Sequence, residues 1–236
     1  MRLFLIIVET TINAILDADS FVFRAAATAD SKGEDLFQAA ARVDYMINTA
    51  LNETEAKEYI LFLTGKDNFR CQVFPEYKAF RKDKPRPKWE QALKNHLKDQ
   101  WDAQIVNGME ADDACGIAQY GSPKDKTILI HHDKDLNQLA GWHYNFVKKE
   151  KYYVDEEMGI TWFLTQLLMG DRTDGIPGID GIGPVKAAKL LSGKTRQEQV
   201  EAILNLYGSE EEMEMNAKCV FIWRKENDYW KDHVLS

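Results

Sequence analysis

The chain has 236 residues, of which 44% are hydrophobic and 11% aromatic, and its formal net charge is −8 at pH 7. This length and apolar content predict one α/β domain with a full core, and no apolar run reaches the roughly 18 residues of a membrane span. The three cysteines, Cys71, Cys115 and Cys219, are odd in number and widely spaced. They exclude a paired disulfide framework or zinc site and favour a reducing compartment, so we expect a cytoplasmic protein. We also expect it to be a monomer.

Short apolar runs alternate with helical patterns along the chain. The nine residues MRLFLIIVE are expected to form a further strand or an N-terminal extension. The pattern predicts strands over 14–16, 59–63, 104–106 and 127–130, and helices over 21–29, 33–52, 89–100, 110–120, 162–169 and from 184 onward. In the second helix, an apolar stripe is expected to face the core at Phe37, Ala40, Val43, Ile47 and Leu51. Strands that alternate with helices indicate a mostly parallel sheet flanked by helices.

The charge is distributed unevenly along the chain. Residues 66–98 contain ten Lys or Arg and four Asp or Glu, a local balance of +6. The aromatic side chains of this basic segment, Tyr77 among them, either stack on bases or pack the segment against the body. If the eight acids described next surround cations, the rest of the chain sums to −8 + 8 = 0, and the basic segment can still bind phosphates.

Eight acidic residues fall in four short clusters at the ends of expected strands and helices. They are Asp17; Glu110, Asp112 and Asp113; Asp133 and Asp135; and Asp171 and Asp174. Acids at a helix start are ordinary caps and dipole partners, which is the simpler interpretation for Glu110 to Asp113 taken alone. Asp171 instead follows the C-terminal end of a helix, where the dipole disfavours an anion. Eight close carboxylates without paired Cys or His favour Mg²⁺ or Mn²⁺.

A glycine-rich turn, Gly175 to Gly183, follows the last acid cluster. Pro184 then opens an expected helix that carries Lys186 and Lys189. Glycines allow backbone N–H groups to approach a phosphate, and Pro at the first helical position leaves the positive end of the helix dipole open. A metal site beside a phosphate site indicates an enzyme that acts on nucleic acid.

Five motifs follow one another in a specific order. They are LDADSFVFRA (16–25), NFRCQVFPEYKAFR (68–81), MEADD (109–113), HDKDLNQLA (132–140) and MGDRTDGIPGIDGIGPVKAA (169–188). In this series the chain resembles the 5′-nuclease superfamily of flap endonucleases and bacteriophage 5′→3′ exonucleases, and its length is most similar to the stand-alone phage type. The resemblance runs from about Ile15 to Leu191.

The resemblance implies a PIN-like 5′-nuclease fold over a single domain, 1–236. Its parts would be an α/β core over 15–165, a helical arch over 66–98, a helix-two-turn-helix element for duplex binding over 166–192, and a helical tail over 193–236.

The resemblance also implies two Mg²⁺ ions, for which Mn²⁺ can substitute, and a K⁺ in the turn from Gly178 to Gly183. Asp17, Glu110, Asp112 and Asp113 would form the tighter site, and Asp133, Asp135, Asp171 and Asp174 the rest. The family commonly has a further Asp after the second strand, where this chain reads Leu63-Thr64-Gly65-Lys66.

Basic residues in the motifs receive roles from the same resemblance. Lys78 and Arg81, three apart and able to share a helix face, would bind the scissile phosphate. Arg24 and Arg70 would hold the 5′ end, and Gly181, Gly183, Lys186 and Lys189 would bind the duplex backbone. The implied activity is two-metal hydrolysis of DNA near 5′ ends, flaps or nicks, with RNA primers and RNA–DNA hybrids as further substrates. Its setting would be phage replication, primer removal or recombination in the host cytoplasm.

Two alternatives stay open from the sequence. One is a catalytically weakened DNA-structure binding protein of the same fold. The lack of the family's further Asp near Gly65 favours this alternative. The other is a Mg²⁺ phosphohydrolase that acts on small molecules. Such an enzyme would need neither the basic segment nor the glycine turn with its lysines, so both features count against it.

Overall fold

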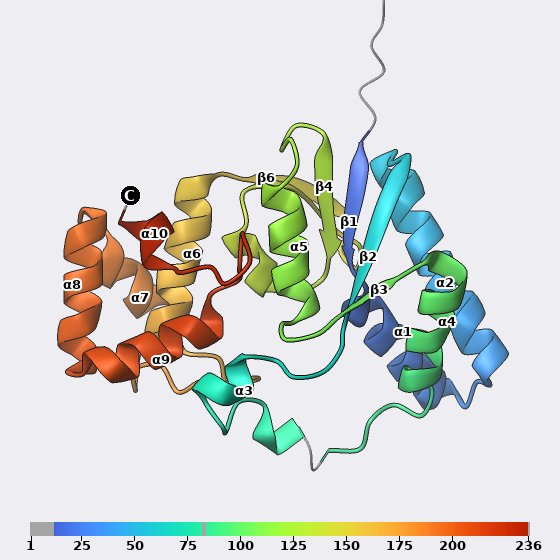
Figure 1. Ribbon diagram of the computed structural model, residues 1–236, viewed down its shortest axis with the longest axis horizontal. Coiled ribbons are helices and arrows are strands. Elements are labelled where there is room, and N and C mark those ends of the chain that lie inside the picture. Colours follow the sequence, from blue (N-terminus) through green and yellow to red (C-terminus); the bar gives the residue numbers. More distant parts are fainter. Residues whose placement is uncertain (1–11, 82–83, 236) are drawn as a thin grey trace, which may run out of the picture.

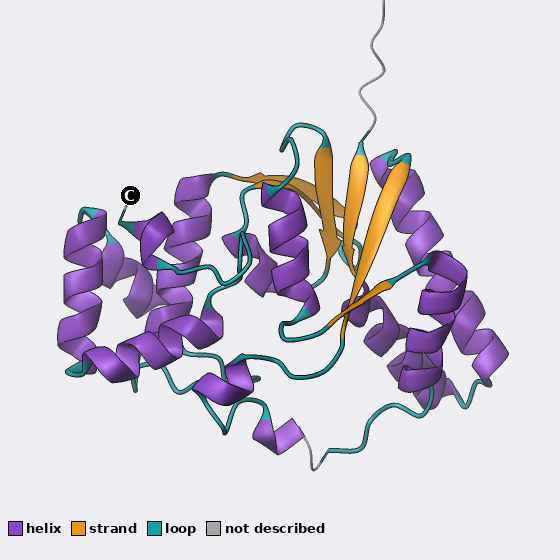
Figure 2. Cartoon of the chain, in the orientation of Figure 1, coloured by secondary structure: helices purple, strands orange, loops and turns teal. Residues whose placement is uncertain are grey.

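The computed structural model describes residues 12–81 and 84–235, so the expectation for the first nine residues lies outside the described part. Six strands form one sheet in the order β3-β2-β1-β4-β5-β6 (Figures 1 and 2). Their bounds are β1 (Asn13–Asp17), β2 (Glu58–Thr64), β3 (Gln104–Val106), β4 (Thr127–His131), β5 (Gly141–Asn145) and β6 (Glu150–Val154). All neighbouring pairs are parallel except β5 and β6. The expected mostly parallel sheet is confirmed, and the β5–β6 hairpin is an addition.

Helices cover both faces of the sheet (Figure 1). Their bounds are α1 (Ala18–Lys32), α2 (Leu36–Thr54), α3 (Arg70–Val73), α4 (Glu90–Trp101), α5 (Ala111–Tyr120), α6 (Glu156–Met169), α7 (Pro184–Leu191), α8 (Arg196–Tyr207), α9 (Glu210–Val220) and α10 (Lys231–Val234). Because successive strand residues point to opposite faces, Leu16 packs with α1, α2 and α4, and Ile15 packs with α5 on the other side. The helices α6 to α10 build a separate apolar core around Phe163, Leu167 and Trp230.

Two helices differ from their expected form. Helix α2 begins at Leu36 because Asp35 and Gln38 form a capping box, and Phe37 is 82% exposed. Placing Phe37 on the core face was therefore wrong; Ala39 and Ala50 lie there beside the correctly expected Val43 and Ile47. Helix α6 begins at Glu156, well before the expected start, because the Asp155 side chain caps it by accepting from Met158 N.

The strand ends fix where the acidic residues gather. The parallel strands β1, β2, β3 and β4 end on the same side of the sheet, and ligands of open α/β sheets bind beyond such ends. Within residues 12–81 and 84–235, we find no helix that has both the length and the apolar character needed to cross a bilayer.

Candidate functional site

A groove of about 1450 Å³ opens beyond the carboxyl ends of the strands. Carboxylates from three motifs line it, namely Asp17 at the end of β1, Asp112 in α5 and Asp133 after β4. Basic side chains line the same groove, and these include Arg24, Lys78, Arg81, Lys84 and Lys94. The fold thus brings acids and bases that are distant in sequence to one surface depression.

Asp17 and Asp112 are desolvated carboxylates close to other acids. Burial, and then the charges of Asp19 and Asp133, raise the pKa of Asp17 to about 7. The Ser20 hydroxyl donates a hydrogen bond to Asp17, which lowers this pKa in part. Burial, and then Asp17 and Asp133, hold the pKa of Asp112 well above its usual range. Among the described residues, Asp112 has no hydrogen-bond or ion-pair partner. Neutralisation of such a carboxylate requires a proton or a cation.

A second group of acids continues from Asp133. Burial, and then Asp133 and Asp171, raise the pKa of Asp135 to about 8. The Asp171 carboxylate accepts from Thr173 N at 2.6 Å, and the Asp171 backbone pairs with Ile176, which fixes this acid just after α6. Asp133 therefore acts electrostatically on both groups and links them into one acidic region.

The eight acids differ in whether a cation already compensates them. Within the described residues, five have no ion pair: Asp17, Asp112, Asp133, Asp135 and Asp171. The other three are paired: Glu110 with Lys78 at 2.5 Å, Asp174 with Arg81, and Asp113 with Arg70 at 2.5 Å. Tyr77, which is buried, places its hydroxyl 2.8 Å from Glu110 Oε2 and 3.0 Å from Asp174 Oδ2.

Arg70 and Asp113 require a correction. Both are buried, at 2% and 0% exposure, and two guanidinium nitrogens of Arg70 donate to the two oxygens of Asp113. Asp113 also accepts from Glu110 N and Trp223 N, and Arg70 also donates to Cys219 O and Phe221 O. The expected metal ligand at Asp113 and DNA contact at Arg70 are therefore wrong. The two side chains form a buried structural ion pair, and Asp113 caps α5 as the simpler interpretation held.

Lys78 and Arg81 reach the acids, but from a different backbone than expected. Lys78 has φ = +55°, and a single 3₁₀ turn, Ala79–Arg81, follows it. The expectation that the two residues share a helix face is wrong, yet both side chains converge on Asp174. Lys78 N donates to Asp174 O at 2.8 Å, which attaches this basic segment to the turn after α6.

The donor set fits a hard divalent cation. Among the described residues, no three His, Cys, Asp or Glu side chains lie close enough together to hold a metal ion by themselves. Mg²⁺ does not require such a group, because it retains several waters and uses one or two carboxylates together with substrate phosphates. The uncompensated carboxylates that line the groove, Asp17, Asp112 and Asp133, supply that type of ligand, and Asp112, desolvated and without a partner among the described residues, is the clearest case.

The glycine turn lies between α6 and α7. A Cβ at Gly178 would lie 2.1 Å from Gly170 N, so close backbone packing requires glycine there, where φ is +62°. Gly181, Gly183, Lys186 and Lys189 are exposed, and neither lysine forms an ion pair within the described residues. Arg24 is exposed on α1 and lines the groove. The positions of these residues leave them accessible to a polyanion, and the K⁺ in this turn stays a prediction.

Gly65 has a packing reason to lack a side chain. A Cβ there would lie 2.3 Å from Asn107 Oδ1 and 2.6 Å from Val106 O. The nearest carboxylate to this strand end is Asp19, which accepts from Thr64 N at 2.9 Å and lies 2.6 Å from Lys94 Nζ. Sequence reasoning gave Asp19 no place at the site, although the motif LDADS contains it.

Comparisons with known proteins show the family of this chain. Residues 13–163 match the family model described as "5′-3′ exonuclease, N-terminal resolvase-like domain". A "5′-3′ exonuclease" of Buchnera aphidicola subsp. Acyrthosiphon pisum (strain APS) is 32% identical over 72% of this chain and 64% of its own length. "Flap endonuclease Xni" of Shewanella sp. (strain W3-18-1) is 34% identical over 52% of each chain. The chain thus spans between half and two thirds of these relatives.

A solved structure shares the fold. The flap endonuclease of bacteriophage T5, in a pseudo-enzyme–product complex with DNA and metal ions, superposes with a TM-score of 0.67. Its sequence identity is 21%, and the match covers 94% of this chain and 96% of that one. The mostly parallel sheet, the groove at its strand ends and the family match over residues 13–163 lead to one conclusion: the chain belongs to the 5′-3′ exonuclease N-terminal resolvase-like domain family.

Proposed function

We propose that this protein is a metal-dependent 5′→3′ exonuclease and structure-specific flap endonuclease that hydrolyses DNA phosphodiesters near 5′ ends. The observation that carries the proposal is a cluster of five uncompensated carboxylates, of which Asp17, Asp112 and Asp133 line one groove together with Lys78 and Arg81. A protein that only binds DNA gains nothing from massed carboxylates near phosphate, because like charges repel. The names of the Buchnera and Shewanella relatives support the same activity.

The uncompensated acids would hold two Mg²⁺ ions. Asp17 and Asp112 would contribute to one site and Asp135 and Asp171 to the other, with Asp133 between them; Glu110 and Asp174 would act through their outer oxygens or waters. Once bound, the ions would supply an activated water and stabilise the leaving 3′ oxygen. Mn²⁺, which has similar ligand preferences, would substitute.

The basic residues would orient the substrate and offset its charge. Lys78 is 25% exposed at its side chain and lies between Glu110 and Asp174, so its ammonium group can exchange one carboxylate for a phosphate oxygen. Arg81, at 37% side-chain exposure, would bind the same phosphate from the outer side. Arg24, which is exposed on α1 and lines the same groove, would hold the 5′ end.

Duplex DNA would lie across the turn between α6 and α7. The exposed Gly181, Gly183, Lys186 and Lys189 would contact its backbone and read no sequence. The T5 structure, which contains DNA and metal ions, supports this partner. A K⁺ held by carbonyls in the Gly178 to Gly183 turn would assist.

The wider setting belongs to the same proposal. The protein would act as a cytoplasmic monomer in phage DNA replication, primer removal or recombination, with RNA–DNA hybrids as additional substrates. Its single domain would divide into the α/β core, the arch over 66–98, the duplex-binding element over 166–192 and the C-terminal helical tail.

Product lengths test the proposal and separate its two activities. The wild-type protein would be incubated with a 5′-labelled flap and a 5′-labelled nicked duplex, each in Mg²⁺ or in EDTA. We expect cleavage in Mg²⁺ only, with mononucleotides from exonuclease action and oligonucleotides of flap length from endonuclease action. Tight binding of both substrates without cleavage in Mg²⁺ or Mn²⁺ would contradict the proposal and favour a DNA-structure binding protein.

A further inference from the structure

The backbone of residues 219–224, here called the C-terminal segment, is held by the buried side chains of Arg70, Asp113 and Gln138. It lies beyond the part of the chain that the family model matches, and in Figure 1 it runs beside α5. Arg70 donates to Cys219 O and Phe221 O, and Asp113 accepts from Trp223 N. Gln138 donates to Val220 O and accepts from Ile222 N. Every one of these contacts is buried or partly buried.

The two contacts of Gln138 fix the orientation of its amide. Gln138 Nε2 lies 2.7 Å from Val220 O, which only accepts, and Gln138 Oε1 lies 3.1 Å from Ile222 N, which only donates. Exchanging the amide nitrogen and oxygen would oppose a carbonyl to a carbonyl and an N–H to an NH₂. Because Gln138 is fully buried, no water can satisfy the exchanged form.

That fixed orientation passes to the next glutamine. The second hydrogen of Gln138 Nε2 is donated to Gln166 Oε1 at 2.7 Å. The carbonyl of Gln166 must therefore face Gln138, and its NH₂ group must face the other way. There, Gln166 Nε2 donates to Asp135 Oδ1 at 2.7 Å.

We infer that Gln166 is a positioning residue for Asp135, and that the C-terminal segment, acting through Gln138, ensures that Gln166 presents a donor to that carboxylate. The inference rests on the proposed function, in which Asp135 binds metal. A donor on Oδ1 restrains the Asp135 side chain and leaves its remaining lone pairs available to a cation. A rotated Gln166 amide would instead place a carbonyl oxygen against the carboxylate.

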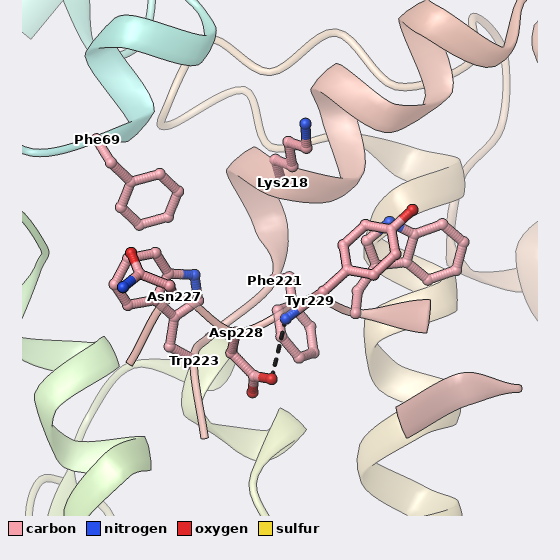
Figure 3. A pocket seen from close by; sticks show the side chains of 8 residues that line it. Phe69, Lys218, Phe221, Trp223, Asn227, Asp228 and Tyr229 are labelled. Carbon is pink, nitrogen blue, oxygen red and sulfur yellow. Dashed lines mark hydrogen bonds between the residues drawn. The ribbon is translucent and has the colours of Figure 1, made fainter. Parts of the chain in front are cut away.

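Packing on the other side of the C-terminal segment holds its backbone in place. Figure 3 shows Phe69, from the start of α3, over Trp223; their rings stack with centroids 4.4 Å apart. Phe221 packs edge-on against Phe163, and Asp228 accepts from Arg224 N and Tyr229 N. Phe69, Phe221 and Trp223 also line the adjoining cavity of about 190 Å³. A segment fixed by rings on one side and hydrogen bonds on the other is a rigid reference for Gln138.

Metal affinity without DNA tests the inference apart from activity. Mn²⁺ binding would be measured by electron paramagnetic resonance for wild type, Gln166→Met, Gln138→Met and the double variant. Outer partners of metal ligands contribute about 10- to 100-fold in affinity, so we expect Gln166→Met to raise the Kd at least about tenfold. Gln138→Met should raise the Kd less, and the double variant should equal Gln166→Met because Gln138 acts only through Gln166.

Two further variants separate positioning from folding. Gln166→Glu keeps the shape and the acceptor for Gln138 but has no donor for Asp135, so it should weaken Mn²⁺ binding as Gln166→Met does. Gln199→Met is the control, because Gln199 is a buried glutamine of α8 that donates to Leu191 O. This variant should leave the Kd unchanged. Thermal unfolding of each variant would confirm that it folds.

The possible results are distinct. Wild-type affinity in Gln166→Met and Gln166→Glu would overturn the inference and leave the proposed function standing. Additive effects of the two glutamines would overturn the relay through Gln138. Absence of Mn²⁺ binding by the wild type would contradict the proposed function itself, and the positioning role with it.

Discussion

The ammonium group of Lys78 lies 2.5 Å from Glu110 Oε1, and so joins the basic segment to the acid that begins α5. The same nitrogen is 3.4 Å from Asp174 Oδ2, in the turn after α6. One cation thus compensates acids from two distant parts of the chain. Its neighbours Asp17 and Asp112 have no such partner, which divides the site into a compensated and an uncompensated half.

Removing the Lys78 amine should reduce turnover far more than DNA affinity. If the ammonium group stabilises charge that develops on the phosphate, Lys78→Ala should lower the single-turnover rate on a 5′ flap by about 100- to 1000-fold. Binding of the same DNA, measured by fluorescence anisotropy in Ca²⁺, should change only slightly. Lys225→Ala, which removes an exposed lysine paired with Asp232, should leave both unchanged. Wild-type turnover in Lys78→Ala would exclude this role.

Neutralising Asp17 should stabilise the protein in EDTA and weaken its response to Mg²⁺. Burial and the nearby Asp19 and Asp133 disfavour the ionised form, so Asp17→Asn removes a repulsive charge. Mg²⁺ at about 100 times its Kd should add about 2.7 kcal/mol to the unfolding free energy of the wild type, and less in the variant. Thermal unfolding with and without Mg²⁺ measures both effects, with the exposed Asp125→Asn as control. An equal Mg²⁺ response in Asp17→Asn would show that Asp17 does not bind the ion.

His143 should make the fold sensitive to mild acid. Burial lowers the pKa of His143 to about 4, and His131 and Tyr152 are the titratable groups that face its ring. As the pH falls, His143 is protonated in the unfolded chain before it is protonated in the folded protein. The contribution of the neutral, buried His143 to the unfolding free energy is therefore complete above about pH 6.5 and is lost as the pH falls toward 4. The unfolding free energy of wild type relative to His143→Gln should fall by about 1–2 kcal/mol between pH 7.5 and pH 5. Urea unfolding at the two pH values provides the comparison, and a constant difference would be the contrary result.

A side chain at Gly65 should damage the fold and restore no activity. The backbone oxygen of Val106 cannot move away from a new Cβ, so Gly65→Ala and Gly65→Asp should each cost about 1–3 kcal/mol of unfolding free energy. Gly183→Ala, where a Cβ meets nothing within 4 Å, should be close to neutral in the same assay. Faster cleavage by Gly65→Asp would contradict the packing argument and support a missing ligand at this position.

The lysines of α7 should contribute uniformly to duplex binding. Lys186→Ala and Lys189→Ala should each weaken binding to duplexes of any sequence and reduce the slope of log K against log salt by about 1. Affinity would be measured across a salt series in EDTA to prevent cleavage. Lys194→Ala is the matched control, because its ammonium group is bonded to Leu190 O. An unchanged slope in both α7 variants would place the duplex elsewhere.

Much of the fold was predictable because its strands are strongly apolar. β1, β2 and β4 are buried on both faces, and runs such as Ile128 to Ile130 reveal them directly. The β5–β6 hairpin was not predictable. Strand β5 buries the polar His143 and Asn145 and exposes Trp142, so it shows no apolar run in the sequence. Phe37 was misplaced because periodicity alone does not fix which of two adjacent stripes on α2 faces the core.

The candidate site was predictable in its acids and not in their partners. Position after a strand or helix end indicated Asp17, Asp133 and Asp171. The pairing of Arg70 with Asp113 joins residues 43 positions apart in sequence, and no local pattern distinguishes such a buried ion pair from a ligand. Gln166 likewise carries no sequence signal, because its role arises from tertiary contacts with Gln138 and Asp135.

We propose that the uncompensated acids make this protein a metal-dependent nuclease of 5′ ends. One gel tests it: cleavage of a 5′-labelled flap in Mg²⁺ by wild type, Asp171→Asn, and Asp155→Asn, the last of which retains a helix cap at α6. We expect cleavage at the 5′ end by wild type and Asp155→Asn, and its loss in Asp171→Asn and in EDTA. Equal cleavage by Asp171→Asn, or wild-type cleavage that persists in EDTA, would contradict it.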